Sequence, residues 1–259
     1  MLETQDLTIR FGGHAAVDGV TCAFQPGTLT AIVGPNGAGK TTYFNLISGQ
    51  LPATSGRVRL HGHDITGLAA PRRSRLGLGR AFQLTNLFPN LTALENVRLA
   101  VQVRRGNSLD LLSRVRGHRE LIDQAMEHLA AVSLADRAHT VAATLPHGDQ
   151  RKLEVAILLA LEPEIFMFDE PTAGMSIDEV PTVLDIIAAI KKRGDKTILL
   201  VEHKMDVVRS LSDRIVVLHQ GKLVADGKPA EVIASDIVRE AYLGGAADGA
   251  GSGAGGGHG

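Results

Sequence analysis

The chain has 259 residues, of which 27 are basic and 28 acidic, so its formal net charge is −1. Only 3% of the residues are aromatic. This balance excludes a nucleic-acid-binding protein that works through a basic face and stacking rings. The length predicts one or two structural units.

The cysteine count, the first residues and the length of the apolar stretches together indicate the cellular compartment. Its single cysteine, Cys22, cannot form an intrachain disulfide, which is typical of a reducing compartment. The first ten residues do not have the basic-then-apolar pattern of a signal peptide. The most apolar stretches, such as residues 156–161, are far shorter than the roughly 20 residues that span a bilayer. We expect a cytoplasmic protein that reaches a membrane only through a partner.

Short apolar runs bounded by turn residues recur at residues 29–34, 164–170 and 196–203, and they predict parallel strands buried on both faces. Helical patterns lie between them. One of these keeps helical spacing from Val180 to Ile190 and ends in basic residues followed by Gly194, a typical helix stop. Strands that alternate with helices predict an α/β fold with a mostly parallel core sheet.

Two regions depart from this alternation. The first sixty residues and residues 214–227 have hairpin patterns, the latter with a turn at Gln220-Gly221, and they predict an antiparallel β subdomain at the N-terminus. Residues 87–161 are helical in pattern and predict an inserted α-helical subdomain. We therefore expect an α/β core from 1–86 and 162–243, the helical insertion 87–161, and a flexible tail 244–259, in which nine of sixteen residues are glycine.

The sequence GPNGAGKT at 34–41 fits the phosphate-loop pattern G-x-x-x-x-G-K-[ST], and it follows a predicted strand and opens a helix. Its glycines allow backbone N–H groups to converge on phosphate oxygens at a helix N-terminus. The alternative, a glycine-rich turn without a ligand, does not explain why all four specified positions of the eight-residue pattern match between a strand and a helix. The residues predicted to bind nucleotide here are Gly34, Pro35, Asn36, Gly37, Ala38, Gly39, Lys40, Thr41 and Thr42, with the Thr41 hydroxyl on Mg²⁺.

Two carboxylates, Asp169 and Glu170, follow the predicted strand in EIFMFDEP, at the end where parallel sheets bind ligands. Asp169 suits the magnesium site, and Glu170 suits a base that accepts a proton from an attacking water. Taken alone, the pair could equally cap the next helix. With the phosphate loop present, the pair indicates a P-loop nucleotide triphosphatase.

Three further motifs resemble those of ATP-binding cassette (ABC) proteins. Gln83, in RAFQ, matches the glutamine that ends a core strand in that family. LPHGDQRKLE at 145–154 resembles the family signature LSGGQ, and His203, in VEH, matches the histidine after the next strand. The order of the motifs resembles an ABC transporter ATP-binding subunit over residues 1–243.

The resemblance implies a role for each matching residue. Phe11, in RFGG, would stack on adenine, although a Phe after an alternating strand could also be a core residue. Gln83 would contact Mg²⁺ or the attacking water, and His203 would contact the γ-phosphate. Asp169, Thr41 and Gln83 would hold the metal. The signature residues Leu145, His147, Gly148 and Asp149 would cover ATP held by a second copy, so that the working unit is a dimer closed around Mg-ATP.

The signature departs from the usual pattern. Pro146 stands in place of a Ser that normally offers a hydroxyl to the γ-phosphate, and Asp149 replaces Gln. Loss of one neutral hydrogen bond weakens such a site by about 0.5–1.5 kcal/mol. Ser176, in DEPTAGMS, occupies a position where Asp is common.

The departures themselves, with RFGGHAAVDGV, VEHKMDVV and the ending VREAYLG, resemble the ATPases of branched-chain amino-acid importers of the LivG/LivF type. Urea and short-amide importers and the lipopolysaccharide-export ATPase have similar endings and stay as alternatives, as does a soluble ABC ATPase that does no transport. The implied partners are a membrane permease, a second ATP-binding subunit and a separate substrate-binding protein, with no nucleic acid. This places the protein on the inner face of the cell membrane. Permease contacts are expected near Gln83, at Leu84, Leu87, Phe88 and Leu91, unless these residues pack within the helical insertion.

Overall fold

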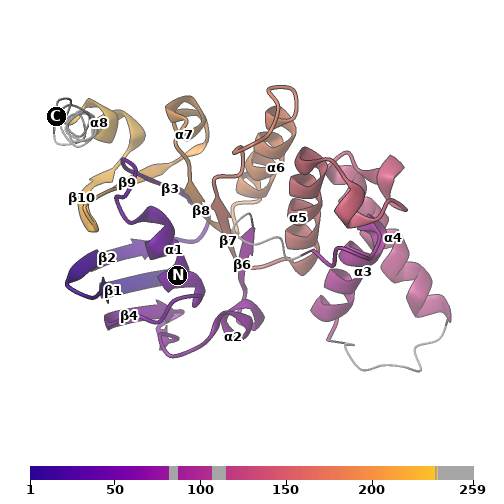
Figure 1. Ribbon diagram of the computed structural model, residues 1–259, viewed down its shortest axis with the longest axis horizontal. Helices are drawn as coiled ribbons and strands as arrows, with labels where there is room; N and C mark the ends of the chain where they lie inside the picture. Colours follow the sequence, from indigo (N-terminus) through magenta and orange to yellow (C-terminus); the bar gives the residue numbers. More distant parts are fainter. Residues whose placement is uncertain (82–86, 107–114, 237, 239–259) are drawn as a thin grey trace, which may run out of the picture. The chain divides into compact units, whose positions relative to one another are not determined.

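The computed structural model describes residues 1–81, 87–106, 115–236 and 238. The chain divides into two compact units, which are described separately (Figure 1). The first comprises residues 1–24, 29–68 and those from 203 onward; the second comprises residues 25–28 and 69–202.

The first unit contains the predicted antiparallel subdomain. Its sheet has the order β2-β1-β4-β5, and Leu2 of the central strand lies opposite Phe24 on one side and Leu60 on the other, all three buried. These strands are β1 (Leu2–Phe11), β2 (His14–Phe24), β4 (Ser55–Leu60) and β5 (His63–Asp64). The hairpin pattern of the first sixty residues is confirmed.

The same unit contains a parallel pair on which the phosphate loop depends. Strand β3 (Leu29–Val33) runs parallel to β9 (Arg214–His219), which turns through Gln220-Gly221 into β10 (Lys222–Gly227), as predicted. Every residue of β3 is buried, which accounts for its continuous apolar sequence. The described part of this unit contains the helices α1 (Lys40–Ser48), α7 (Met205–Leu211) and α8 (Pro229–Ala234).

The second unit has a parallel sheet and a group of helices. Strand β7 (Ile165–Asp169) pairs in parallel with both β6 (Leu78–Ala81) and β8 (Thr197–Val201), and all residues of β7 and β8 are buried. The predicted helical insertion contributes α3 (Ala93–Arg104), α4 (Val115–Ala131) and α5 (His147–Leu161), which gather together in Figure 1. Two 3₁₀ turns lie between α4 and α5, at Ala135–Arg137 and Ala142–Thr144; the other helices are α2 (Ala70–Arg75) and α6 (Val180–Lys192).

Helix α6 ends where its sequence predicts, with Lys191 and Lys192 in the last turn and Gly194 in the left-handed region (φ 70°). The predicted fold class is confirmed: an α/β protein with an antiparallel subdomain, a parallel-rich core and inserted helices. The domain boundaries stay predictions, and the tail 244–259 lies outside the described residues. Across the described ranges, no helix combines the length and apolarity needed to cross a membrane.

Candidate active site

The shape of the phosphate loop, residues 34–42, depends on the backbone conformation of its glycines. Gly34, Gly37 and Gly39 all have positive φ angles, of 151°, 78° and 96°. A Cβ atom on Gly34 would lie 2.1 Å from the carbonyl oxygen of Leu218, and one on Gly39 would lie 2.3 Å from that of Ala16. Only glycine fits at these two positions. A Cβ on Gly37 would meet nothing within 4 Å, so the loop is open at its tip.

A lysine and a hydroxyl complete the loop. The buried Lys40 folds back so that Nζ donates to the carbonyl oxygens of Gly34 and Pro35, at 2.7 and 2.9 Å. Thr41 follows it in the first turn of α1 and is exposed. Backbone N–H groups at a helix N-terminus, a lysine and a hydroxyl fit the phosphates of a nucleotide.

The magnesium expectation also fits the residues present. Within the described ranges, no three His, Cys, Asp or Glu side chains gather as a metal cluster. Mg²⁺ at such a site is normally held by nucleotide phosphates, waters and one or two protein oxygens, and the exposed Thr41 hydroxyl is an oxygen of that kind.

The tight turn after β9 holds the phosphate loop by backbone hydrogen bonds. The Gly221 N–H donates to the carbonyl oxygen of Ala38 at 3.0 Å, and the Gly221 oxygen accepts from the Asp18 N–H of β2 at 2.9 Å.

Phe11, at the end of β1, is 53% exposed, so the alternative that it is a core residue is wrong. Its stacking on adenine stays a prediction. His203, which precedes α7, is also exposed, and its contact with the γ-phosphate stays a prediction.

In the second unit, the acidic strand end places Asp169 and Glu170 side by side in sequence but in different surroundings. Asp169, the last residue of β7, is buried and accepts a hydrogen bond from Arg80 Nη2 of β6 at 2.7 Å. Burial lowers the pKa of the Arg80 guanidinium, and the Asp169 carboxylate opposes that shift. The pair therefore keeps a carboxylate in place at the carboxyl end of the sheet.

Glu170 is half-buried and has a φ of 51°, a left-handed conformation that costs a non-glycine residue about 1–3 kcal/mol. Its N–H donates to the Val201 carbonyl of β8 at 2.9 Å, and the next segment is fixed by a hydrogen bond from the Thr172 hydroxyl to the buried Glu202 carboxylate. Strain held in this way is typical of functional positions. It turns the chain sharply at the residue predicted to be the base.

The signature turn, residues 145–149, opens helix α5. Pro146 is its N-cap, Leu145 and Gly148 are buried, and His147 is exposed. Asp149 is buried and forms ion pairs with Arg137 and Lys152, at 2.9 and 3.1 Å, within its own chain. Contact of these residues with a nucleotide in a second copy stays a prediction.

The phosphate loop and the acidic strand end agree with two family matches. A family model described as "ABC transporter" matches residues 17–173, and one described as "Branched-chain amino acid ATP-binding cassette transporter" matches residues 222–248. The chain belongs to the ABC transporter family.

Relatives match this ABC ATPase over nearly its whole length. The high-affinity branched-chain amino acid transport ATP-binding protein BraF of Pseudomonas aeruginosa is 40% identical, over 94% of this chain and 98% of its own. The crystal structure of an ATP-binding cassette in its ADP conformation superimposes with a TM-score of 0.79 at 30% identity, covering 94% of this chain and 98% of its own. A dimeric cassette in a post-hydrolysis state, bound to ADP and Pi, has a TM-score of 0.76 at 26% identity, over 88% and 99% of the two chains.

The segment of the ABC ATPase that leads into α3 carries the predicted permease contacts. Gln83 and Leu84 lie outside the described residues. Leu87 and Leu91 are partly buried, whereas Phe88 is 56% exposed. The apolar contacts predicted here therefore divide between residues that pack inward and one that faces outward.

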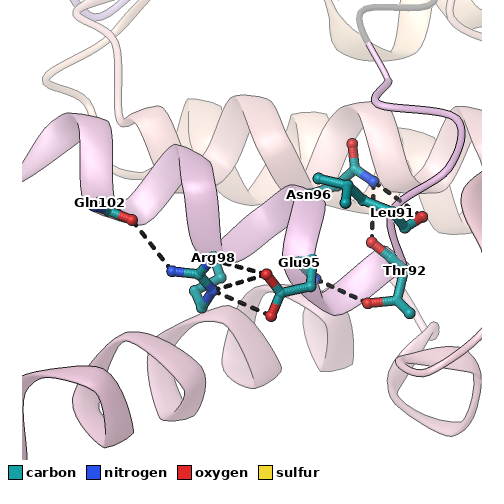
Figure 2. Close-up of polar contacts among 6 residues, drawn as sticks. All are labelled: Leu91, Thr92, Glu95, Asn96, Arg98 and Gln102. Atoms are coloured by element: carbon teal, nitrogen blue, oxygen red, sulfur yellow. Dashed lines mark hydrogen bonds and ion pairs between the residues drawn. The ribbon is translucent and has the colours of Figure 1, made fainter. Parts of the chain in front are cut away.

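Asn96 of α3 holds this segment in shape. Its Nδ2 donates to the carbonyl oxygens of Phe88 and Thr92, at 3.1 and 2.9 Å, and its Oδ1 accepts from the Phe88 N–H at 2.8 Å. Thr92 caps α3 by accepting from the Glu95 N–H at 3.2 Å (Figure 2). Arg98 donates to the Glu95 carboxylate at 2.8 Å and to Gln102 at 3.2 Å.

Sequence reasoning did not single out Arg80, Lys152, Glu179 or Asn96. For Asn96 a local signal exists, because Thr92-x-x-Glu95 is a capping-box pattern that marks the start of a helix. For Arg80 the signal is weaker: a lone cation in a four-residue buried strand needs a buried anion, but only strand register shows which one.

Proposed function

We propose that the chain is the ATP-hydrolysing subunit of an importer of branched-chain amino acids, and that two such subunits close around Mg-ATP to drive a separate membrane permease. The observation that carries this proposal is the similarity to BraF, which extends over 94% of this chain and 98% of the relative. The match at residues 222–248 to a family model for branched-chain amino-acid cassettes supports the same substrate class.

Nucleotide binding is assigned to the phosphate loop. The backbone N–H groups of residues 34–42 and the Lys40 ammonium hold the β- and γ-phosphates, and Phe11 stacks on the adenine. Thr41, Asp169 and Gln83 are the residues that would hold Mg²⁺. When bound, the metal neutralises charge on the phosphates. Arg80 holds the Asp169 carboxylate at the carboxyl end of β7.

Hydrolysis is assigned to Glu170. Its carboxylate accepts a proton from the attacking water, a role worth roughly 10²–10⁴ in rate. The left-handed backbone at Glu170 and the Thr172–Glu202 hydrogen bond support this role, since they fix the direction of the chain at the base. His203 and Gln83 are assigned to the γ-phosphate and to the attacking water.

The second copy completes each site through its signature turn, residues Leu145, His147, Gly148 and Asp149. A dimeric solved cassette with ADP and Pi supports this arrangement. ATP shifts the monomer–dimer equilibrium only as far as it binds the closed dimer more tightly. Closure and reopening are the movements that the permease receives, so the chain is peripheral on the cytoplasmic face of the membrane.

Permease contact is assigned to the surface around Phe88. A large exposed aromatic on a segment that Asn96 holds by hydrogen bonds is a rigid anchor of the kind that dominates interfaces. Val141 is 38% exposed and lies beside this segment, because it forms a β-bridge with Thr92.

Affinity purification from detergent-solubilised native membranes tests the proposal. We expect two polytopic membrane proteins and a second ATPase to be retained, and vesicles that contain the set to take up leucine with ATP and a substrate-binding protein. Phe88→Ser should release the membrane proteins, whereas Leu76→Ser, at a comparably exposed apolar residue of the second unit, should not.

Different partners would redirect the proposal. Recovery of lipopolysaccharide-export proteins, or uptake of urea or short amides in place of leucine, would replace the substrate class. Recovery of no membrane protein, with ATP hydrolysis intact, would contradict a transport role.

A further inference from the structure

The segment that follows the predicted base, residues 173–179, lies against the signature turn of the same chain. A Cβ atom on Gly174 would lie 3.5 Å from the His147 ring, and one on Gly148 would lie 2.1 Å from Glu179 Oε1. A side chain at Gly148 would therefore displace the Glu179 carboxylate, which is the movable end of a flexible side chain.

Glu179 joins the two elements through both of its oxygens. Oε2 accepts from the N–H and the hydroxyl of Ser176, at 3.1 and 2.9 Å, and so closes the segment on itself. Oε1 lies 3.6 Å from Lys152 Nζ on helix α5. The hydrogen bonds from Ser176, together with Lys152, lower the pKa of the Glu179 carboxyl, so it is anionic at neutral pH.

Lys152 also forms an ion pair with Asp149 of the signature turn, and Asp149 pairs with a further cation. The Lys152 Nζ donates to Asp149 Oδ1 at 3.1 Å, and Asp149 Oδ2 accepts from Arg137 at 2.9 Å. The side chains of Lys152 and Asp149 are only 13% and 10% exposed. Solvent therefore screens the Lys152–Asp149 pair less than it screens an ordinary surface ion pair, whereas the Glu179 side chain is 27% exposed.

We propose that Glu179 and Lys152 are positioning residues, which hold the signature turn and residues 173–179 together as one surface for the second copy. The inference rests on the proposed function, because it assigns these elements to the dimer. It accounts for the departures at Pro146 and Asp149: with the usual Ser and Gln absent, the backbone at Gly148 carries more of the nucleotide contact, and its position is fixed by an ion-pair bridge.

The test uses ATP-dependent dimerisation of the full chain in a Glu170→Gln background, in which ATP binds and is not turned over. Glu179→Gln, Lys152→Met and the double variant are compared by analytical ultracentrifugation at fixed Mg-ATP. A fluorescent ATP analogue measures nucleotide binding by the monomer in parallel. Lys152→Arg keeps the positive charge, and Asp185→Asn neutralises an exposed carboxylate six residues further along α6.

We expect each single variant to weaken dimerisation about three- to tenfold, and the double variant to weaken it no more than the stronger single one, because both remove the same bridge. Lys152→Arg and Asp185→Asn should dimerise as the parent does, and all should bind nucleotide with the parent's affinity.

Three results would overturn the inference: singles that dimerise normally, a double variant whose loss is the product of the two singles, or monomers that have lost nucleotide binding. A parent Glu170→Gln chain that does not dimerise with ATP would instead contradict the proposed function, and the inference that rests on it. That failure is visible before any bridge variant is measured.

Discussion

The phosphate loop and the signature turn both open a helix, but they are held in different ways. In the loop, Gly34 and Gly39 approach the carbonyl oxygens of Leu218 and Ala16 so closely that no side chain fits. In the signature turn, ion pairs among Arg137, Asp149, Lys152 and Glu179 fix the backbone. A site fixed by backbone contacts cannot change its glycines, whereas one fixed by side chains can be rebuilt with other residues.

The sequences of the phosphate loop and of the signature turn differ in the corresponding way. The loop keeps every position of its pattern, whereas the signature keeps Gly148 and replaces most of its neighbours. A Cβ on Gly148 would meet only the Glu179 carboxylate, which can move aside, so the packing at Gly148 differs from that at Gly34 and Gly39. The comparison predicts large, all-or-none effects at the closely packed glycines and smaller, graded effects at polar contacts.

The largest effect is expected from Gly39→Ala. A methyl group there would meet the Ala16 oxygen, and its φ of 96° disfavours any side chain, so we expect a loss of about 4 kcal/mol in unfolding free energy. Gly37→Ala, in open space at φ 78°, should lose only about 1–2 kcal/mol. Urea unfolding measures both, and equal losses would contradict the account of the loop.

Arg80→Met should have the next largest effect. It leaves the Asp169 carboxylate buried without its cation, and removing one partner of a buried ion pair costs about 3 kcal/mol. Arg80→Lys keeps the charge and should recover most of this loss. Urea unfolding measures the stability, and fluorescence of a bound ATP analogue gives the Mg²⁺ concentration needed for half-maximal binding. If Arg80→Met were as stable as the parent, Arg80 would not hold Asp169 in place.

Asn96→Ala tests a polar contact that belongs to neither the phosphate loop nor the signature turn. It leaves the Phe88 N–H and the Phe88 carbonyl without their side-chain partner, which should cost about 2 kcal/mol. Hydrogen exchange should accelerate at residues 88–92 in particular. Asn90→Ala, at an exposed position of the same segment, is the control. Unchanged exchange at residues 88–92 would show that other contacts hold this segment.

The smallest effect concerns pH. Burial raises the pKa of the Cys22 thiol to about 11, from an ordinary value of 9.0. Because the folded chain favours the neutral thiol, its stabilising effect is complete below pH 9 and is lost as the pH rises toward 11. Between pH 8 and 10 we expect a loss of about 1 kcal/mol in unfolding free energy. Cys22→Ala should show a shallower pH dependence; identical slopes would assign the change to other groups.

Local patterns were sufficient to predict the strand and helix framework. The strands at 29–34, 164–170 and 196–203, the Gln220-Gly221 turn and the end of α6 at Gly194 depend on apolar periodicity and on glycine conformation, both of which are visible within a few residues.

Contacts between distant segments were not predictable in this way. The Arg80–Asp169 pair depends on the register of β6 against β7, and the Lys152–Glu179 bridge joins helix α5 to the N-cap residue of α6, which lies 27 residues after Lys152. Asp149 was assigned from the motif alone, without its ion pairs. A side chain's partners follow from tertiary packing, which no single segment contains.

The central claim is that Glu170 is the base of an ATPase whose phosphate loop binds ATP independently of it. The most direct test is the rate of ATP hydrolysis by Glu170→Gln at saturating Mg-ATP, with nucleotide affinity measured on the same sample and Glu127→Gln, an exposed carboxylate of α4, as control. We predict that hydrolysis falls at least about 100-fold while affinity stays within about twofold of the parent. Hydrolysis at the parent rate would contradict the claim.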